Sequence, residues 1–161
     1  MSAHLLDRAG WNALIGPHAY LAEINGLARR YPADISPFNA VADIENPQAW
    51  RDLRELIGEE GTAIVIGESF SAPSGWEITN IFPGVQMTGE AVVGQPDSEL
   101  VPLTLTDSTE MLALVARTEP GPFVSRTVEL GGYLGLRIEG ELVAHSLAAV
   151  AVQDDGVVQP Q

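Results

Sequence analysis

Residues 103–144 read LTLTDSTEMLALVARTEPGPFVSRTVELGGYLGLRIEGELVA, and their pattern changes from helical to extended along the way. The Pro/Gly-rich segment Glu119 to Pro122 (EPGP) ends a helical pattern, because proline cannot continue a helix. Two extended runs follow, Gly132 to Ile138 and Glu141 to Val150. The dipeptide Glu139-Gly140 joins them, and its glycine suits the positive φ of a two-residue hairpin turn. The stretch therefore predicts a helix, a loop and an antiparallel hairpin.

The beginning of this stretch predicts a strand and a capped helix. Val101 to Leu105 has the apolar alternation of a strand, and Asp107 and Glu110 have the spacing of a capping box at a helix start. The helix presents one apolar stripe at helical spacing, formed by Met111, Leu114, Val115 and Thr118. The order strand, helix, loop, hairpin is typical of an α+β fold with a mainly antiparallel sheet and flanking helices.

The residues before this stretch predict shorter elements. Leu21, Ile24 and Ala28 share a face of a helix over residues 18–30, although Asn25-Gly26 interrupts it. Asn46 followed by Pro47 predicts a helix start, and Gly58 its end.

Two extended segments follow that helix. Thr62 to Ile66 (TAIVI) has the composition of a buried strand, and Gly75 to Met87 predicts two extended pieces separated at Pro83-Gly84. The polar, turn-forming segment Gly94 to Glu99 predicts a boundary between residues 1–95, an extension of short helices and strands, and residues 96–161.

Composition excludes several classes of protein. The chain has 161 residues, no cysteine and 45% hydrophobic residues, and no apolar run is long enough to cross a membrane. Its N-terminus does not resemble a secretory signal, so we expect a cytoplasmic protein without a membrane partner. The net charge of −14, with all eight basic residues arginine, disfavours nucleic-acid binding. An acidic surface more often serves solubility, and the alternative is that it attracts a cationic amine substrate.

Familiar catalytic motifs are weak or missing in the sequence. Gly67 to Ser71 (GESFS) resembles a nucleophile elbow around Ser69, but its fifth residue is not glycine and no helix pattern follows. His4, His18 and His145 are too far apart for zinc-ligand spacing, so no metal is expected. Neither a dinucleotide-binding nor a P-loop glycine motif occurs.

The whole of residues 103–144 resembles the opening of the catalytic domain of GNAT-superfamily N-acetyltransferases. The most specific segments are Ala116 to Phe123 (ARTEPGPF) and Arg126 to Arg137 (RTVELGGYLGLR). Residues 75–87 (GWEITNIFPGVQM), with WNALIGPHAYLAE and ARRYPADISPF nearer the N-terminus, are similar to the extension that precedes this domain in one bacterial GNAT subgroup. The resemblance implies a GNAT-like mixed, mainly antiparallel sheet.

The resemblance also implies an activity, and it implies which part of the active site the residues of this chain form. Such enzymes transfer an acetyl group from acetyl-CoA to a small-molecule or peptide amine. The loop after the first helix borders that amine, which implies acceptor-side roles for residues 119–123, namely Glu119, Pro120, Gly121, Pro122 and Phe123. The alternative is that this segment only terminates the helix and packs Phe123 inward. No catalytic residue is assigned.

The end of the chain departs from the family pattern. GNAT enzymes bind acetyl-CoA through a fourth strand and an [RQ]-x-x-G-x-[GA] loop, whose amides hold the pyrophosphate. After Ala144 the sequence reads HSLAAVAVQDDGVVQPQ, without such a loop. We therefore expect a domain truncated after its third core strand, an impaired enzyme and no tight acetyl-CoA binding. The alternative is a non-catalytic binding or oligomerisation module that self-associates through an exposed sheet edge.

Overall fold

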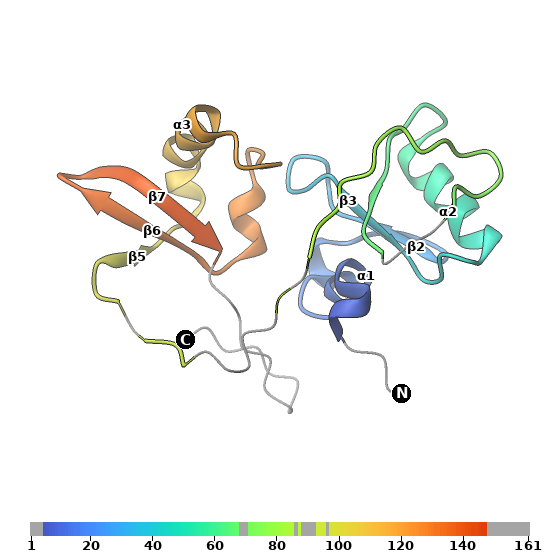
Figure 1. Ribbon diagram of the computed structural model, residues 1–161, viewed down its shortest axis with the longest axis horizontal. Coiled ribbons are helices and arrows are strands. Elements are labelled where there is room, and N and C mark those ends of the chain that lie inside the picture. The colour runs from blue at the N-terminus through green and yellow to red at the C-terminus, as the bar shows by residue number, and fades with distance from the viewer. Residues whose placement is uncertain (1–4, 68–70, 86, 88–92, 96, 148–161) are drawn as a thin grey trace. The chain divides into compact units, whose positions relative to one another are not determined.

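The computed structural model covers residues 1–161 and describes all of them except 1–4, 68–70, 86, 88–92, 96 and 148–161 (Figure 1). The chain forms two compact units. The first comprises residues 1–32 and 37–93, and the second comprises residues 94–161 together with residues 33–36. A short N-terminal segment is therefore part of the second unit.

The first unit is a four-stranded sheet with a helix packed on it. Its strands β1 (Glu23–Asn25), β2 (Ala28–Arg30), β3 (Phe38–Val41) and β4 (Ile64–Val65) lie in this order, with β3 and β4 parallel and the other pairs antiparallel. The helix α2 (Pro47–Ile57) joins β3 to β4. Its buried residues pack against the sheet in a core formed by Ala28, Val41, Ala49, Trp50 and Leu53. The N-terminal η1 (Leu5–Arg8), α1 (Ala9–Ile15) and η2 (Ala19–Leu21) complete the unit.

The helix α2 confirms its predicted boundaries. The Asn46 side chain accepts a hydrogen bond of 2.9 Å from the Gln48 N–H, and Pro47 occupies the first turn. Gly58 ends the helix with φ 87°, a conformation that favours glycine.

The predicted helix over residues 18–30 is wrong, because these residues form η2 and the hairpin of β1 and β2. The chain reverses at Gly26, which has φ 49°. The Leu27 N–H donates to the Asp52 carboxylate at 2.7 Å, and the Asn25 side-chain amide donates to the Asp52 carbonyl at 3.0 Å. Bonds to α2 thus stabilise a turn, and these bonds outweigh the helical spacing of the apolar residues.

The two extended predictions that follow α2 are also corrected. The segment Thr62 to Ile66 contributes only the two residues of β4, and Ile64 and Ile66 are exposed because β4 pairs with β3 alone at the end of the sheet. The described part of residues 75–87 contains no strand. There the Trp76 ring meets the Trp50 ring edge-on with centroids 5.4 Å apart, so side-chain packing and not strand pairing fixes this segment.

The second unit contains the predicted order of strand, helix and hairpin, although the strand ends at Pro102 and Leu105 begins a 3₁₀ turn. The last three residues of the predicted hairpin, 148–150, lie outside the described residues. Strands β5 (Leu100–Pro102), β6 (Tyr133–Ile138) and β7 (Glu141–Leu147) form an antiparallel sheet in that order (Figure 1). The hairpin turn has φ 52° at Glu139 and 87° at Gly140, as predicted. Helix α3 (Ser108–Thr118) packs on the sheet through a core of Leu103, Met111, Leu114, Val128 and Leu142. The α+β, mainly antiparallel fold is confirmed.

The predicted cap of α3 is displaced by one turn. Asp107 precedes α3 but makes no side-chain cap bond to it. Its carboxylate instead accepts from the Thr104 N–H at 2.9 Å, at the start of η3 (Leu105–Asp107). The chain enters the helix through this 3₁₀ turn, so the capping interaction moves upstream with the true start of the helical segment. Of the helices in the described residues, none is long and apolar enough to cross a membrane.

Candidate functional site

The loop after α3 begins with an abrupt helix end. Thr118 is the last residue of α3, and Glu119 adopts a left-handed conformation with φ 44° while its N–H donates to the Val115 carbonyl at 2.8 Å. Pro120, Gly121 and Pro122 follow on the surface. The predicted acceptor-side residues 119–122 are therefore solvent-accessible in this unit.

Phe123 differs from the four residues before it, because its ring is half-buried. It packs on the core of the second unit and meets the Tyr133 ring edge-on, with centroids 5.8 Å apart. Its centroid is 5.2 Å from that of the His145 imidazole, and the Tyr133 and His145 rings are 6.1 Å apart. A loop and two strands thus bring together three rings, which we call the aromatic cluster: Phe123, Tyr133 and His145.

Buried hydrogen bonds fix the part of the loop that follows Phe123. Thr127, at the start of η4 (Thr127–Leu130), is 5% exposed. Its hydroxyl accepts from the Val124 N–H at 2.8 Å and donates to the Ile35 carbonyl at 2.7 Å. The Ser108 hydroxyl donates to the Ser125 carbonyl. The loop is therefore tied both to the first turn of α3 and to the segment 33–36.

Ion pairs reinforce this anchor. Arg126 pairs with Asp34 at 3.0 Å and with Glu129 at 2.6 Å. Hydrogen bonds from the Arg126 guanidinium lower the pKa of Glu129, and those to Glu129 and Asp34 raise the pKa of Arg126. One guanidinium thus pairs with two carboxylates at this end of the loop. Among the predicted acceptor-side residues, Glu119 is the acidic one and lies exposed.

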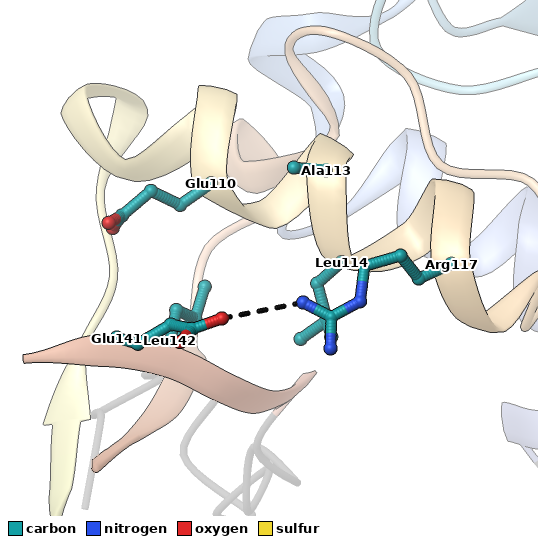
Figure 2. Close-up of a pocket in the computed structure, with 6 residues that line it drawn as sticks. All are labelled: Glu110, Ala113, Leu114, Arg117, Glu141 and Leu142. Atoms are coloured by element: carbon teal, nitrogen blue, oxygen red, sulfur yellow. Dashed lines mark hydrogen bonds and ion pairs between the residues drawn. The ribbon is translucent and has the colours of Figure 1, made fainter. Parts of the chain in front are cut away.

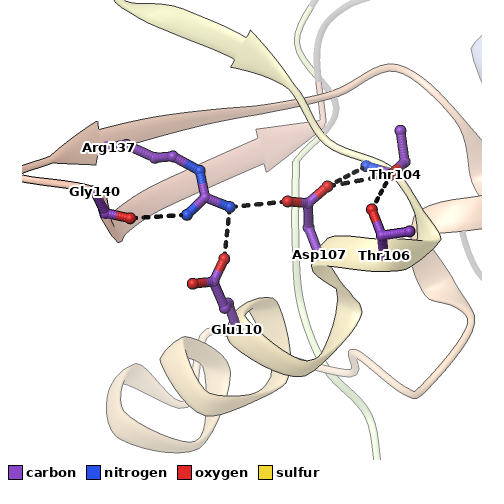
Figure 3. Close-up of polar contacts among 6 residues, drawn as sticks. All are labelled: Thr104, Thr106, Asp107, Glu110, Arg137 and Gly140. Atoms are coloured by element: carbon purple, nitrogen blue, oxygen red, sulfur yellow. Dashed lines mark hydrogen bonds and ion pairs between the residues drawn. The ribbon is translucent and has the colours of Figure 1, made fainter.

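A second polar cluster joins the sheet to the start of α3 (Figure 3). Arg137 of β6 donates to Asp107 at 2.8 Å and to Glu110 at 2.5 Å. The Thr104 N–H is the main cause of the lowered pKa of Asp107, and the bond to Glu110 is the main cause of the raised pKa of Arg137. With its carboxylates engaged by the arginine, this cluster positions the helix on the sheet and has no free acid or base.

A small pocket lies between α3 and β7 (Figure 2). Its volume is about 130 Å³, and it is lined by Glu110, Ala113, Leu114, Arg117, Glu141 and Leu142. Arg117 and Glu141 pair across it at 3.4 Å. This volume is below the range of roughly 300–1,000 Å³ typical of sites for small organic ligands.

The first unit has a larger pocket, of about 530 Å³, between η1, α1 and the ends of β3 and β4. Trp11 contributes to its wall, with the Arg8 and Arg29 guanidinium groups 5.5 and 4.8 Å from its ring. Asp7 and Asp43 also line the pocket. The lining therefore carries charges of both signs.

The remaining sequence candidates take no part in these clusters. Ser69 and His4 lie outside the described residues, and the His18 imidazole is hydrogen-bonded to the Tyr31 hydroxyl at 2.7 Å. Burial raises the pKa of Tyr31 to about 12. In the described part of the chain, no three His, Asp or Glu side chains are grouped as they would be around a metal ion.

Sequence reasoning identified Phe123 but missed Tyr133 and His145 as its neighbours. Tyr133 begins β6 and could be placed near the loop from the order of elements alone. His145 reaches the same face through an irregularity of the hairpin, where Arg137 pairs with Leu142 but Leu136 pairs with Ala144. No turn or glycine signal in the sequence marks that irregularity.

Comparison with known proteins agrees with this architecture. The chain is similar to the crystal structure of a proposed GNAT-family acetyltransferase from Novosphingobium aromaticivorans, with 33% sequence identity and a TM-score of 0.68. The match covers 89% of this chain and 63% of the other, so the chain spans just under two thirds of that relative's length. No protein-family model and no curated protein matches the sequence. The chain is therefore similar in both sequence and fold to a GNAT-family protein, and the resemblance predicted from the sequence is confirmed.

Proposed function

We propose that this chain is the acceptor-binding portion of a GNAT-type N-acetyltransferase, which transfers an acetyl group from acetyl-CoA to an amine. The observation that carries the proposal is the similarity to the Novosphingobium protein in both sequence and fold over about nine-tenths of the chain. The exposed loop of residues 119–122 and the half-buried Phe123 supply a surface for the acceptor.

The reaction needs little covalent chemistry from the protein. The amine nitrogen attacks the thioester carbonyl of acetyl-CoA, the new C–N bond forms as the C–S bond breaks, and coenzyme A leaves as a thiol. A protein accelerates such a transfer by orienting the amine, accepting its proton and donating hydrogen bonds to the developing oxyanion. In this proposal the chain contributes the first of these tasks, orientation of the amine.

The described residues do not fit acetyl-CoA itself. A pyrophosphate is bound at a helix N-terminus with free backbone amides. The N-terminus of α3 carries Asp107 and Glu110, both already paired with Arg137. The N-terminus of α2 is capped by the Asn46 side chain. We therefore propose that the chain alone binds acetyl-CoA weakly, in line with its net charge of −14.

A chimera tests the proposed function. Residues 1–144 of this chain would be joined to the remainder of the Novosphingobium protein, and acetyl transfer would be measured by thiol release over a panel of amines accepted by that relative. We expect acetyl transfer by the chimera, and only weak heat of acetyl-CoA binding for the chain alone. A folded chimera that binds acetyl-CoA but acetylates none of these amines would reject the proposal.

A second candidate function is self-association through β7. This strand is at the end of the order β5–β6–β7, and Val143 and Leu147 are 37% and 50% exposed. Within the described residues β7 pairs with β6 alone, so its other edge is available for strand addition. We expect Ser146→Lys to shift an oligomer toward monomer in sedimentation velocity, with Ser98→Lys, outside the sheet, as its control. A monomer at millimolar concentration would exclude this role.

A further inference from the structure

The aromatic cluster combines three rings that are each partly buried. Phe123 comes from the loop after α3, Tyr133 from the first position of β6 and His145 from β7. The centroid separations of 5.2 to 6.1 Å are those of rings in direct contact. The three rings meet edge-on or tilted, with interplanar angles of 50° to 89°, and form a partly exposed cluster that begins at the last of the predicted acceptor-side residues, Phe123.

Most charged side chains on the elements that carry the aromatic cluster form ion pairs with other residues. On β6 and β7 the other charged side chains are Arg137, paired with Asp107 and Glu110, and Glu141, paired with Arg117. In the loop, Arg126 is paired with Asp34 and Glu129, while Glu119 is exposed.

His145 itself has ring contacts but no hydrogen bond or ion pair with another described residue. Tyr133 is the titratable group in contact with it, and burial raises the pKa of Tyr133, so the phenol stays neutral at physiological pH. The imidazole is therefore the other ionisable ring of the aromatic cluster. Histidine side chains generally change charge between pH 5 and 8.

Aromatic faces attract organic cations through the quadrupole of the ring. A primary amine is an ammonium ion near neutral pH, and the acidic chain raises the local concentration of cations. We propose that Phe123, Tyr133 and His145 bind the ammonium group of the acceptor while the imidazole is neutral, and that protonation of His145 releases it. This inference rests on the proposed function, which assigns the adjoining loop to the acceptor side.

The class of acceptor follows from the same surface. The aromatic cluster favours a cationic amine carried on an apolar or aromatic group, because the rings attract the cation and also pack against the carbon skeleton. A neutral molecule of the same shape would retain only the apolar contact. His145 is thus a residue that determines specificity for a charged acceptor.

The test uses the full chain without acetyl-CoA and 2-phenylethylamine as the probe. Binding would be followed by NMR through the ring signals of His145 and Tyr133, at pH 7.5 and pH 5.5. We expect saturable binding at pH 7.5 that weakens about tenfold or more at pH 5.5. His145→Gln should bind equally at both pH values. The control His18→Gln, a histidine of the first unit, should retain the pH dependence.

Two further comparisons separate recognition of the cation from simple packing. Phe123→Leu should weaken binding roughly 5- to 30-fold, the range expected for loss of one cation–π contact, and Phe123→Tyr should restore it. The neutral analogue 2-phenylethanol should bind at least tenfold more weakly than the amine. Equal binding of the alcohol, an unchanged pH dependence in His145→Gln, or no saturable shift at pH 7.5 would overturn the proposal.

The outcome is separable from that of the proposed function. Because acetyl-CoA is absent from this experiment, failure of the chimera to transfer acetyl groups leaves the amine measurement valid. Conversely, an active chimera combined with pH-independent amine binding would support the acetyltransferase proposal and reject the role of His145.

Discussion

Replacing Gly26 by alanine distinguishes the observed hairpin from the helix that the apolar spacing predicts. Within a helix, glycine to alanine stabilises by about 1 kcal/mol. In the structure Gly26 has φ 49°, and a Cβ placed there would lie 2.8 Å from the Asp52 carboxyl carbon. The two interpretations therefore predict opposite signs for the same substitution.

The expected magnitude has two parts. Holding alanine in the left-handed region costs about 1–2 kcal/mol. The new methyl group also displaces the Asp52 carboxylate, which accepts from the Leu27 N–H at 2.7 Å. Loss of a backbone hydrogen bond of this kind adds about 1 kcal/mol. We expect Gly26→Ala to destabilise the first unit by about 2–3 kcal/mol.

Urea unfolding followed by tryptophan fluorescence suits the measurement, since the three tryptophans all lie in the first unit: Trp11, Trp50 and Trp76. Gly84→Ala is the matched control within the first unit, because no atom lies within 4 Å of a Cβ there and its φ is not in the left-handed region. In an Asp52→Ala background, Gly26→Ala should cost only the conformational part, about 1–2 kcal/mol. A stabilised Gly26→Ala protein would refute the reasoning.

Three other substitutions test the packing of the second unit and the charge of the first. Leu114→Ala should destabilise by roughly 2–5 kcal/mol in denaturant melts because Leu114 is 8% exposed, whereas Leu105→Ala, at a 54% exposed position, should cost much less. Thr127→Val should cost about 2–3 kcal/mol, since it leaves the Ile35 carbonyl and the Val124 N–H without their hydroxyl partner, and fast exchange of that amide would accompany the loss. The hydrogen bond from the Leu27 N–H lowers the pKa of Asp52. The ionised Asp52 carboxylate therefore stabilises the folded chain above the ordinary aspartate pKa of about 4, and this stabilisation is lost as the pH falls from there through the lowered pKa. Melts of Asp52→Asn between pH 6 and 2 should show a smaller acid-induced decrease, and an unchanged decrease would contradict this assignment.

The sequence predicts an element correctly where residues at its own two ends determine where it begins and stops. Asn46, Pro47 and Gly58 delimit α2 as predicted, because a side-chain cap, a preset φ and a positive-φ stop act within one or two residues. The prediction is wrong where the conformation of a segment depends on a residue that is distant in the sequence. The hairpin at Gly26 depends on the hydrogen bond from Leu27 to the Asp52 carboxylate, and no pattern in the sequence near Gly26 indicates that bond.

The same distinction explains which part of the aromatic cluster could be predicted. With a regular two-residue turn at Glu139-Gly140, His145 would pair with Leu134, and its ring would be on the opposite face of the sheet from Tyr133. In the structure Val143 has no counterpart on β6, so the register shifts by one residue and His145 pairs with Gly135. One extra residue reverses the face on which every later side chain of β7 lies. The imidazole therefore reaches Tyr133 and the loop through a bulge, and alternation in the sequence would have placed it on the wrong face.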